Sequence, residues 1–471
     1  MKAALLIDFG STYTKAVAVD LESAEILGTS QGPTTVERGI MVGLHETLHR
    51  LHRTTGKMEY SRKLACSSAA GGLRMIAAGF VRELTAEAAQ RAALGAGAKV
   101  HAVFSDGLDE DDVNAIRTID PEIVLLSGGT DGGNREILLH NAGKIAAVPL
   151  RATVVVAGNR KAGREACRIL REGGREVVLT DNVMPALNVL NVEPAREAIR
   201  SVFMKRIVSA KGLDDALSFV DGILMPTPMA VLRAARFLAG GVHGRDGMGD
   251  LMVVDVGGAT TDIHSVADGA PTGRAVWKGL PEPREKRTVE GDLGLRCNAA
   301  SVLGKAGGES ILRHAGLQED DDGDLRNYVA RIVSATDHVP ACDRESAFDK
   351  GLAKAAVSIA MARHAGSIEE AYFADGRVEI QKGKDLTAVK TVIGTGGVFS
   401  RGTNGFDVLE GARYDRREPF SLRPRQPDLY LDHRYILFAV GLLLEAAPET
   451  AFRVAVENLK KRPSIGGTKQ G

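Results

Sequence analysis

The sequence has few aromatic residues, few cysteines and no excess of charge of either sign, and these shortages argue against several classes of protein. Its 60 basic residues equal its 60 acidic residues, and no Lys/Arg stripe with interleaved aromatics suggests nucleic acid as a main partner. The four cysteines form no Cys-x-x-Cys pair, which argues against a zinc site and indicates reduced thiols. The longest apolar run, 436–444, is far shorter than the roughly 20 residues of a membrane span. We therefore expect a cytoplasmic protein with no membrane partner.

What the chain does have is length and a regular alternation of elements. Its 471 residues are enough for several subdomains with a ligand cleft. Apolar β-branched runs alternate with Ala-rich helical stretches, which is typical of an α/β protein. Strands are expected at 123–126, 153–156 and 177–179, with a helix at 161–171. This βα rhythm predicts an inserted Rossmann-like subdomain over about 99–211.

The main functional clue is an internal repeat. Residues 6–15 and 253–262 carry Asp, Gly and Thr at matching positions, and each copy has the pattern of two strands joined by a small polar turn. Glycine in such a turn lets backbone amides approach a phosphate without a Cβ in the way. A single copy is explained equally well as an ordinary β-hairpin. Two aligned copies favour a pair of phosphate-binding hairpins.

Each position of the repeat has a predicted role. Asp8 and Asp255 end their first strands and are expected to hold Mg²⁺ through its waters, because this ion keeps much of its hydration and prefers oxygen ligands. Lys15 would neutralise phosphate charge. The predicted phosphate-binding residues are Gly10, Ser11, Thr12, Tyr13, Thr14 and Lys15 in the first copy, and Gly257, Gly258, Thr260 and Thr261 in the second. Two such hairpins facing each other would position ATP for phosphoryl transfer.

A third glycine-rich element follows a predicted strand at 391–393. Gly394, Thr395, Gly396 and Gly397 can form a bare backbone platform for adenosine. Such a cluster alone usually marks a loop, but its place after two phosphate hairpins favours a nucleoside site. No Walker pattern ending in Gly-Lys-Ser/Thr is present in the sequence.

A possible catalytic carboxylate lies in the turn that contains Glu290 and Asp292. A carboxylate in that turn can orient the water that attacks a phosphate, and Asp292 is the better candidate. Helix capping or simple solvent exposure explains these residues about equally well.

These motifs together resemble the actin, Hsp70 and hexokinase superfamily: 8–15 matches its first phosphate motif, 255–262 its second and 394–397 its adenosine motif. The resemblance implies duplicated ribonuclease-H-like domains around a nucleotide cleft, with the Rossmann-like α/β subdomain as an insert. It also implies ATP hydrolysis with Mg²⁺, coupled to conformational change. The expected parts are a first ATPase lobe at 1–98, the insert at 99–211, a second lobe with the second phosphate motif at 212–300, a mainly helical subdomain at 301–384, the adenosine motif with a closing helix at 385–459, and a flexible tail at 460–471.

A narrower resemblance rests on segments 7–15, 125–133, 255–262 and 289–294. They are similar to signatures of the accessory ATPases of adenosylcobalamin-dependent glutamate mutase, a family called MutL or GlmL and unrelated to the mismatch-repair protein. The resemblance implies a reactivating chaperone that exchanges damaged cobalamin for intact coenzyme, with the mutase as partner.

Other interpretations of the chain stay open. Segment 127–133 is interpreted as a structural turn or a mutase-binding surface, since Asp131 would repel a phosphate there. The alternative functions are a small-molecule kinase of the same fold, which would need a catalytic base beside a substrate pocket, and a filament-forming actin-like protein.

Overall fold

A computed structural model shows how the chain folds. The residues it describes are 2–10, 12–35, 39–68, 73–93, 96, 98–210, 214–271, 275–279, 282–373, 376–401 and 404–463. They form two compact units: unit 1 contains Met1–Ala4, Val17–Thr29 and Ala230–Gly471, and unit 2 contains Leu5–Ala16 and Ser30–Met229. Each unit is considered by itself.

The first sheet contains the first copy of the repeat. Its strand order is β10-β4-β1-β2-β3, with β1 (Ala3–Phe9), β2 (Tyr13–Asp20), β3 (Ile26–Pro33), β4 (Tyr60–Ser67) and β10 (Gly222–Pro226). Every residue of β1 is buried, as expected for an apolar strand with neighbours on both sides. Helices α1 (Ile40–Thr55) and α7 (Asp214–Phe219) accompany this sheet in the chain.

The inserted subdomain is a fully parallel sheet within unit 2. Its order is β6-β5-β7-β8-β9, with β5 (Leu73–Ala78), β6 (Ala98–Phe104), β7 (Ile123–Leu126), β8 (Thr153–Val156) and β9 (Glu176–Leu179). Its helices are α2 (Arg82–Ala93), α3 (Glu110–Ile119), α4 (Glu136–Ala147), α5 (Arg160–Glu172) and α6 (Glu193–Ala210). This order, 2-1-3-4-5 when counted within the insert, is a doubly wound arrangement of the flavodoxin type. The Rossmann-like character of the insert is therefore confirmed.

The second copy of the repeat lies in the main sheet of unit 1. The order is β16-β14-β13-β19-β20-β21, with β13 (Leu251–Val256), β14 (Thr261–Val266), β16 (Glu285–Glu290), β19 (Thr391–Thr395), β20 (Asp428–Asp432) and β21 (Leu459–Lys461). The strand order β3-β2-β1-β4-β10 of the first sheet corresponds to β16-β14-β13-β19-β20 here. The predicted duplicated α/β fold of the actin and Hsp70 class is thus present.

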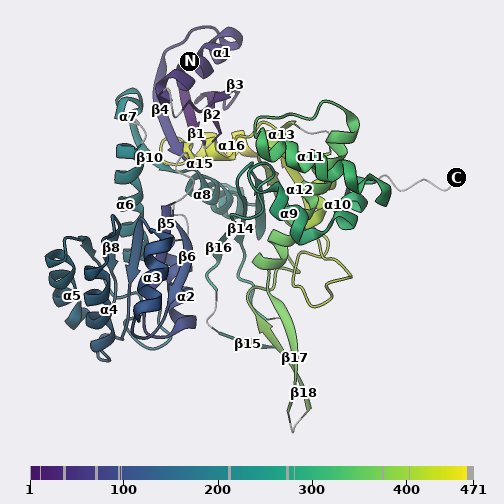
Figure 1. Cartoon of the computed structure of the whole chain (residues 1–471). Coiled ribbons are helices and arrows are strands. Elements are labelled where there is room, and N and C mark those ends of the chain that lie inside the picture. The colour runs from purple at the N-terminus through teal and green to yellow at the C-terminus, as the bar shows by residue number, and fades with distance from the viewer. Residues whose placement is uncertain are drawn as a thin grey trace. The chain divides into compact units, whose positions relative to one another are not determined.

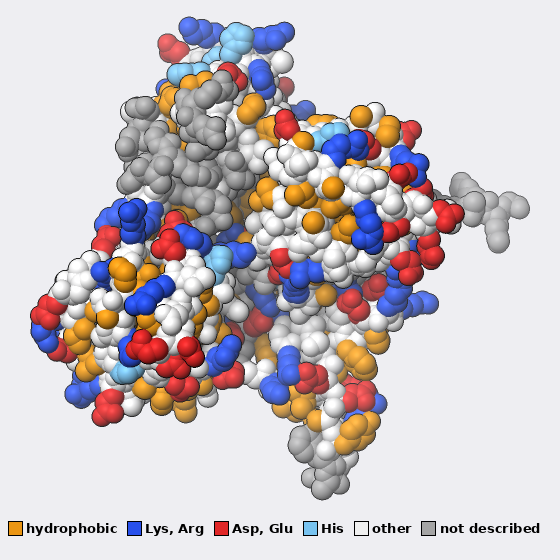
Figure 2. Space-filling view, viewed as in Figure 1, with side chains coloured by type: hydrophobic (Ala, Val, Ile, Leu, Met, Phe, Trp, Pro, Cys, Tyr) orange, Lys and Arg blue, Asp and Glu red, His pale blue; other side chains and the backbone are white. Residues whose placement is uncertain are grey.

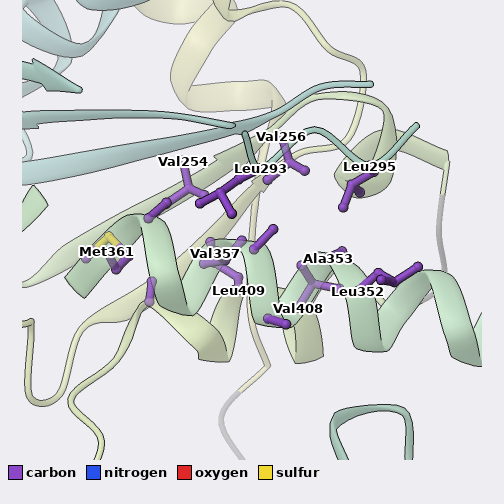
Figure 3. Packing of buried hydrophobic residues seen from close by; sticks show 14 of the residues in the cluster. Val254, Val256, Leu293, Leu295, Leu352, Ala353, Val357, Met361, Val408 and Leu409 are labelled. Atoms are coloured by element: carbon purple, nitrogen blue, oxygen red, sulfur yellow. The ribbon is translucent and has the colours of Figure 1, made fainter. Parts of the chain in front are cut away.

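Helices cover the main sheet of unit 1 (Figure 1). They are α8 (Thr227–Gly240), whose first three residues belong to unit 2, α9 (Ala299–Ala306), α10 (Gly308–Ala315), α11 (Asp322–Ser334), α12 (Asp343–His364), α13 (Gly397–Arg401), α14 (Gly405–Leu409), α15 (Leu437–Leu443) and α16 (Pro448–Asn458), with short 3-10 turns at Glu319–Asp321 and Glu410–Ala412. Figure 3 shows Val254 and Val256 of β13 facing the apolar side of α12 at Ala353 and Val357. That shared core fixes the second hairpin against α12.

Unit 1 also contains smaller β elements. A three-stranded sheet has the order β15-β18-β17, with β15 (Val276–Lys278), β17 (Ser367–Phe373) and β18 (Gly376–Lys382). A short ribbon pairs β11 (Gly241–Val242) with β12 (Arg245–Asp246). The segment 301–384, expected to be mainly helical, therefore ends in a long hairpin, since β17 pairs with β18 along its whole length.

Two of the predicted domain boundaries also differ from those in the structure. The insert begins near residue 73 and not at 99, because β5 pairs with β7, about 50 positions further along the chain. The predicted tail 460–471 starts with strand residues, since Lys460 and Lys461 pair with β20, and 464–471 lie outside the described residues. Both differences come from long-range pairing that local pattern does not report.

The surface carries both charges intermingled. Figure 2 shows Lys and Arg side chains lying among Asp and Glu on the visible face, in keeping with the balanced composition. Over the described ranges, no helix combines the length and apolar character that crossing a membrane requires.

Candidate functional site

The second hairpin closes in a tight turn, and the carbonyls of Gly257, Gly258 and Ala259 accept hydrogen bonds from one neighbouring segment. Gly257 N donates to Thr260 O at 2.9 Å to close the turn. The segment 295–298 binds the turn through Leu295 N to Gly257 O (3.1 Å), Arg296 N and Cys297 N to Gly258 O (2.8 and 3.0 Å), and Asn298 Nδ2 to Ala259 O (2.9 Å). The loop after β16 therefore holds the back of the turn.

Two backbone amides of the same turn, unlike these carbonyls, have no hydrogen-bond partner among the described residues. No acceptor in the described part of the chain is bonded to the backbone N–H of Gly258 or Ala259. The turn itself is only partly buried. Consecutive N–H groups without acceptors form a concave, partly positive surface that suits an anion. The geometry of this turn suits the phosphate role predicted for Gly258, whereas the amide of Gly257 and the hydroxyl of Thr260 are bonded within the hairpin.

Gly294 explains how the loop after β16 comes so close to the turn. A Cβ on Gly294 would lie 2.2 Å from the carbonyl carbon of Ala259, a distance that no side chain can occupy. Any other residue at 294 would push the two segments apart.

The predicted adenosine motif lies directly beside the second hairpin. β19 runs parallel to β13, with Thr395 opposite Asp255. Gly396 has φ 108°, and a Cβ there would lie 2.4 Å from Val256 O and 3.0 Å from Asp255 Oδ1. The structure thus brings Gly396 against the strand that carries Asp255.

The other glycines of the adenosine motif differ in their surroundings. Gly394 is covered by the ring of Phe399, which a Cβ would meet at 2.8 Å, whereas a Cβ on Gly397 would meet nothing within 4 Å. Gly397 is also exposed. It is therefore the glycine of the motif that leaves open space for a ligand.

A buried carboxylate that the sequence did not single out supports this motif. Asp432, fully buried at the end of β20, accepts hydrogen bonds from Thr395 Oγ1 (2.9 Å) and from the amides of Ile436 and Leu437 (both 2.9 Å). Burial raises the pKa of Asp432, against the effect of these donors. The predicted residue Thr395 therefore binds the chain just before α15, and its hydroxyl is not directed at a ligand.

The turn end of the first hairpin lies in unit 2, and Asp8 there is 1% exposed. Lys15 Nζ lies 2.7 Å from Asp8 Oδ2, and Thr227 Oγ1 donates to Asp8 Oδ1 at 2.6 Å. Cys66 Sγ lies 3.7 Å from the same Oδ1, and burial, followed by the charge of Asp8, raises the pKa of this thiol. The sequence alone did not single out Thr227 as a partner of Asp8, although a threonine between two prolines, Pro226 and Pro228, is typical of a helix start.

Several predicted hydroxyl donors are used within the protein. Thr14 is buried and bonds to Thr34 Oγ1 at 3.1 Å, and Thr261 donates to Leu293 O at 2.8 Å. Thr260 donates to Asp262 Oδ2 at 2.9 Å. Thr12 is exposed, and Ser11 lies outside the described residues. The hydroxyls of Thr14 and Thr261 thus brace the hairpins in this structure.

Glu290 and Asp292 share one arginine of α12. Arg363 binds both carboxylates, with distances of 2.9 and 3.1 Å to the two oxygens of Asp292, and Lys305 lies 3.4 Å from Asp292. Burial raises the pKa of Glu290, whereas hydrogen bonding to Arg363 lowers the pKa of Asp292. Asp292 is 40% exposed and Glu290 only 12%, so Asp292 is the carboxylate that solvent reaches.

The glycine-rich loop 127–133 at the end of β7 is held by asparagines. Asn159, fully buried, donates from Nδ2 to Thr130 O, Gly133 O and Asn134 O. Asn182 donates to Gly129 O and Asp131 Oδ1, each at 3.0 Å. These hydrogen bonds explain the conformation of loop 127–133 as that of a structural turn.

Within unit 1 the structure therefore brings together the second hairpin, the adenosine motif and the Glu290–Asp292 turn. Asp8 and Lys15, with the turn end of the first hairpin, belong to unit 2, whereas the outer ends of its two strands belong to unit 1. Each hairpin presents a carboxylate beside a glycine turn, a set of oxygen and amide groups that suits hydrated Mg²⁺ and phosphate.

Comparison with known proteins gives a match over nearly the whole chain. The model of the MutL protein family matches residues 4–459. A protein named MutL from Clostridium tetanomorphum is 49% identical over 464 residues, covering 98% of this chain and all of the relative.

Solved structures give weaker likenesses. A nucleotide-free diol dehydratase-reactivating factor is 11% identical, covers 95% of this chain and 100% of its own, and has a TM-score of 0.32. A nucleotide-free acetone carboxylase is 13% identical, covers 93% of this chain and 69% of its own, and has a TM-score of 0.37. TM-scores this low assign no role to any individual residue of this chain.

Proposed function

The chain belongs to the MutL protein family, and from this membership we propose that it is an ATP-hydrolysing accessory protein of an adenosylcobalamin-dependent mutase. Glutamate mutase is the proposed partner. The proposed action is reactivation, in which ATP turnover changes the protein's conformation and the mutase exchanges damaged cobalamin for intact coenzyme. A change of conformation can do such work only if the mutase binds one nucleotide state more tightly than another.

One observation carries the nucleotide part of the proposal. The backbone of the second hairpin's turn is polarised, because the carbonyls of Gly257, Gly258 and Ala259 are bonded to 295–298 while the amides of Gly258 and Ala259 have no acceptor in the described chain. A turn arranged in this way suits the oxygens of a phosphate, and the strand that leads into it, β13, pairs with β19, which runs into the adenosine motif. Both features occur in one unit of a duplicated fold.

The proposed roles follow from the donor types. Asp8 and Asp255 would hold Mg²⁺ through its waters, and bound Mg²⁺ would supply charge neutralisation on the phosphates. Lys15, which now lies against Asp8, would add positive charge for the phosphates. Asp292 would orient the attacking water, since its carboxylate is ionised at neutral pH and partly exposed.

The hydrolysis part is tested with Asp8→Ala. This change removes a buried carboxylate, so we expect no ATP hydrolysis above background in the presence of Mg²⁺. Asp8→Asn, which keeps an acceptor for Thr227, guards against a simple loss of folding. Wild-type rates in both variants would reject the assignment of Asp8.

The reactivation part needs the mutase. Inactivated glutamate mutase is mixed with ATP, Mg²⁺ and fresh adenosylcobalamin, with and without this protein, and mutase turnover is measured. We expect turnover to recover with the wild-type protein and not with Asp8→Ala. A protein that hydrolyses ATP but restores no turnover would reject reactivation and leave the ATPase assignment intact.

A further inference from the structure

Arg296 connects the turn of the second hairpin to the helices α11 and α12. Its backbone N–H donates to Gly258 O at 2.8 Å, and the first carbons of its side chain lie 3.6 and 3.7 Å from where a Gly258 Cβ would be. Both the main chain and the side chain of Arg296 therefore contact the turn.

The guanidinium of Arg296 continues away from the turn and binds a carboxylate of α12. Its two terminal nitrogens lie 2.7 and 3.2 Å from the two oxygens of Asp349. Its Nε donates to His338 O, in the connection between α11 and α12, at 3.3 Å. A forked arginine–carboxylate pair fixes direction as well as distance, which a single hydrogen bond does not do.

Asp349 is held on its other side by a buried tyrosine. Tyr328 of α11 is 1% exposed and donates its hydroxyl to Asp349 Oδ1 at 2.8 Å. Burial and the charge of Asp349 raise the pKa of Tyr328, so its hydroxyl stays a donor at any working pH. The ring of Phe348 packs on Tyr328 at 5.6 Å between centroids. Asp349 is thus fixed from α11, from α12 and from Arg296.

The Arg296–Asp349 pair is almost out of water, with side chains 17% and 13% exposed. Removing one partner of such a pair leaves a charge that the surroundings no longer compensate. Arg296 belongs to segment 295–298, which donates hydrogen bonds to the carbonyls of Gly257, Gly258 and Ala259, so loss of the pair would act on the turn through this segment.

We propose that Arg296 is a positioning residue for the phosphate-binding turn, and that it acts through its pairing with Asp349. The pair orients segment 295–298, the segment orients the carbonyls of Gly257 and Gly258, and the amides of the turn then face the phosphates. The inference rests on the proposed nucleotide binding. It predicts that α11 and α12 stabilise the binding of the phosphates and do not contact the adenosine.

The test separates phosphate binding from nucleoside binding. Affinities of the full-length wild type and of Arg296→Ala are measured by calorimetry for ADP with Mg²⁺ and for adenosine. We expect the affinity for ADP to fall about tenfold or more, the loss typical of a charge-assisted hydrogen-bond pair, while the affinity for adenosine changes less than twofold. Asp349→Ala should give the same pattern, and the double variant should lose no more than either single one, because the two residues act as a unit.

Further variants guard against a general effect on folding. Arg296→Lys keeps the charge but not the fork and should lose part of the ADP affinity, and Tyr328→Phe removes only one donor to Asp349 and should lose less. Arg313→Ala, which breaks an exposed pair with Glu309 in α10, should bind ADP as the wild type does.

Two outcomes would overturn the inference. One is an equal loss of ADP and adenosine affinity in Arg296→Ala, which would mean a general structural role. The other is unchanged ADP affinity in both Arg296→Ala and Asp349→Ala. If the wild type itself bound neither ADP nor ATP with Mg²⁺, the proposed function would fail first and the positioning role with it.

Discussion

Thr227 Oγ1 donates a 2.6 Å hydrogen bond to Asp8 Oδ1, across 219 positions of the chain. Both residues belong to unit 2, and Thr227 is the first residue of α8, whose residues from Ala230 onward belong to unit 1. The carboxylate proposed to hold Mg²⁺ is therefore bonded directly to the start of the helix that leads from one unit into the other. A change at Asp8 therefore removes a contact with the first residue of that helix.

The first prediction concerns this hydrogen bond. Thr227→Val keeps the shape of the side chain and leaves Asp8 without one of its donors. We expect a loss of about 1.5–3 kcal/mol in the free energy of unfolding, as for hydrogen bonds to charged groups. Urea denaturation monitored by circular dichroism measures it, and Thr227→Ser, which retains the hydroxyl, should lose much less. Equal stability of the Val and Ser variants would contradict the importance of the bond.

The second prediction concerns Gly294, which a Cβ would drive into Ala259. Gly294→Ala should separate the loop after β16 from the phosphate turn and lower ATP hydrolysis at least about 100-fold, as small displacements of a reacting group can do. Gly304→Ala is the matched control, because Gly304 is exposed within α9 and a Cβ there meets nothing within 4 Å. That control should stabilise the helix by about 0.5–1 kcal/mol. Hydrolysis at the wild-type rate in Gly294→Ala would show that the close approach is dispensable.

The third prediction concerns pH and two buried histidines of unit 1. Burial, with Arg287 nearby, lowers the pKa of His264 to about 3, and burial, with Lys286, lowers the pKa of His364 well below its usual value. Below pH 6.5 the unfolded chain takes up protons at these sites and the folded chain does not. Stability is therefore lost as pH falls from 6.5, by about 1.4 kcal/mol per pH unit for each histidine.

His264→Leu tests this linkage. Neither ring nitrogen of His264 has a hydrogen-bond partner among the described residues, so the substitution should be tolerated at pH 7 and should make the acid-side slope shallower. Trp277, the single tryptophan, lies in unit 1, so its fluorescence follows the unfolding of this unit in urea. The exposed His243→Gln serves as control. An unchanged slope in His264→Leu would contradict the assignment.

The fourth prediction separates the two carboxylates bound by Arg363. Asp292→Asn should lower ATP hydrolysis by about 10²–10⁴-fold, the range of a lost general base or water-orienting group, with ATP affinity nearly unchanged. Glu290→Gln, bound to the same arginine but more buried, is the matched control and should keep most activity. Single-turnover hydrolysis and equilibrium binding give the two quantities. If Glu290→Gln lost more hydrolysis activity than Asp292→Asn, the water-orienting role would be assigned to Glu290.

Much of the local structure followed from local pattern. The strands predicted at 123–126 and 153–156 are β7 and β8 with the same bounds, and both hairpins of the repeat form as expected. Short, fully apolar β-branched runs between turn residues have few alternatives, which is why their positions were predictable.

The errors came from pairing over long distances. β5 was assigned to the first lobe, but it pairs with β7 in the insert. The hairpin of β17 and β18 was assigned to a helical region, since its charged, alternating residues carry a weak strand signal and its partner β15 lies about 100 positions earlier.

By itself the sequence determined the duplicated hairpins, the family and the candidates Asp8, Asp255 and Asp292, because glycine, aspartate and apolar spacing act over a few residues. Only the tertiary structure decided which of these groups are already bonded within the protein. Thr14 and Thr261 give their hydroxyls to neighbouring segments, while Thr227 binds Asp8 and Arg296 binds the turn of the second hairpin, although neither residue lies in a predicted motif. Such pairs depend on how distant elements pack, and that packing is a property of the whole core.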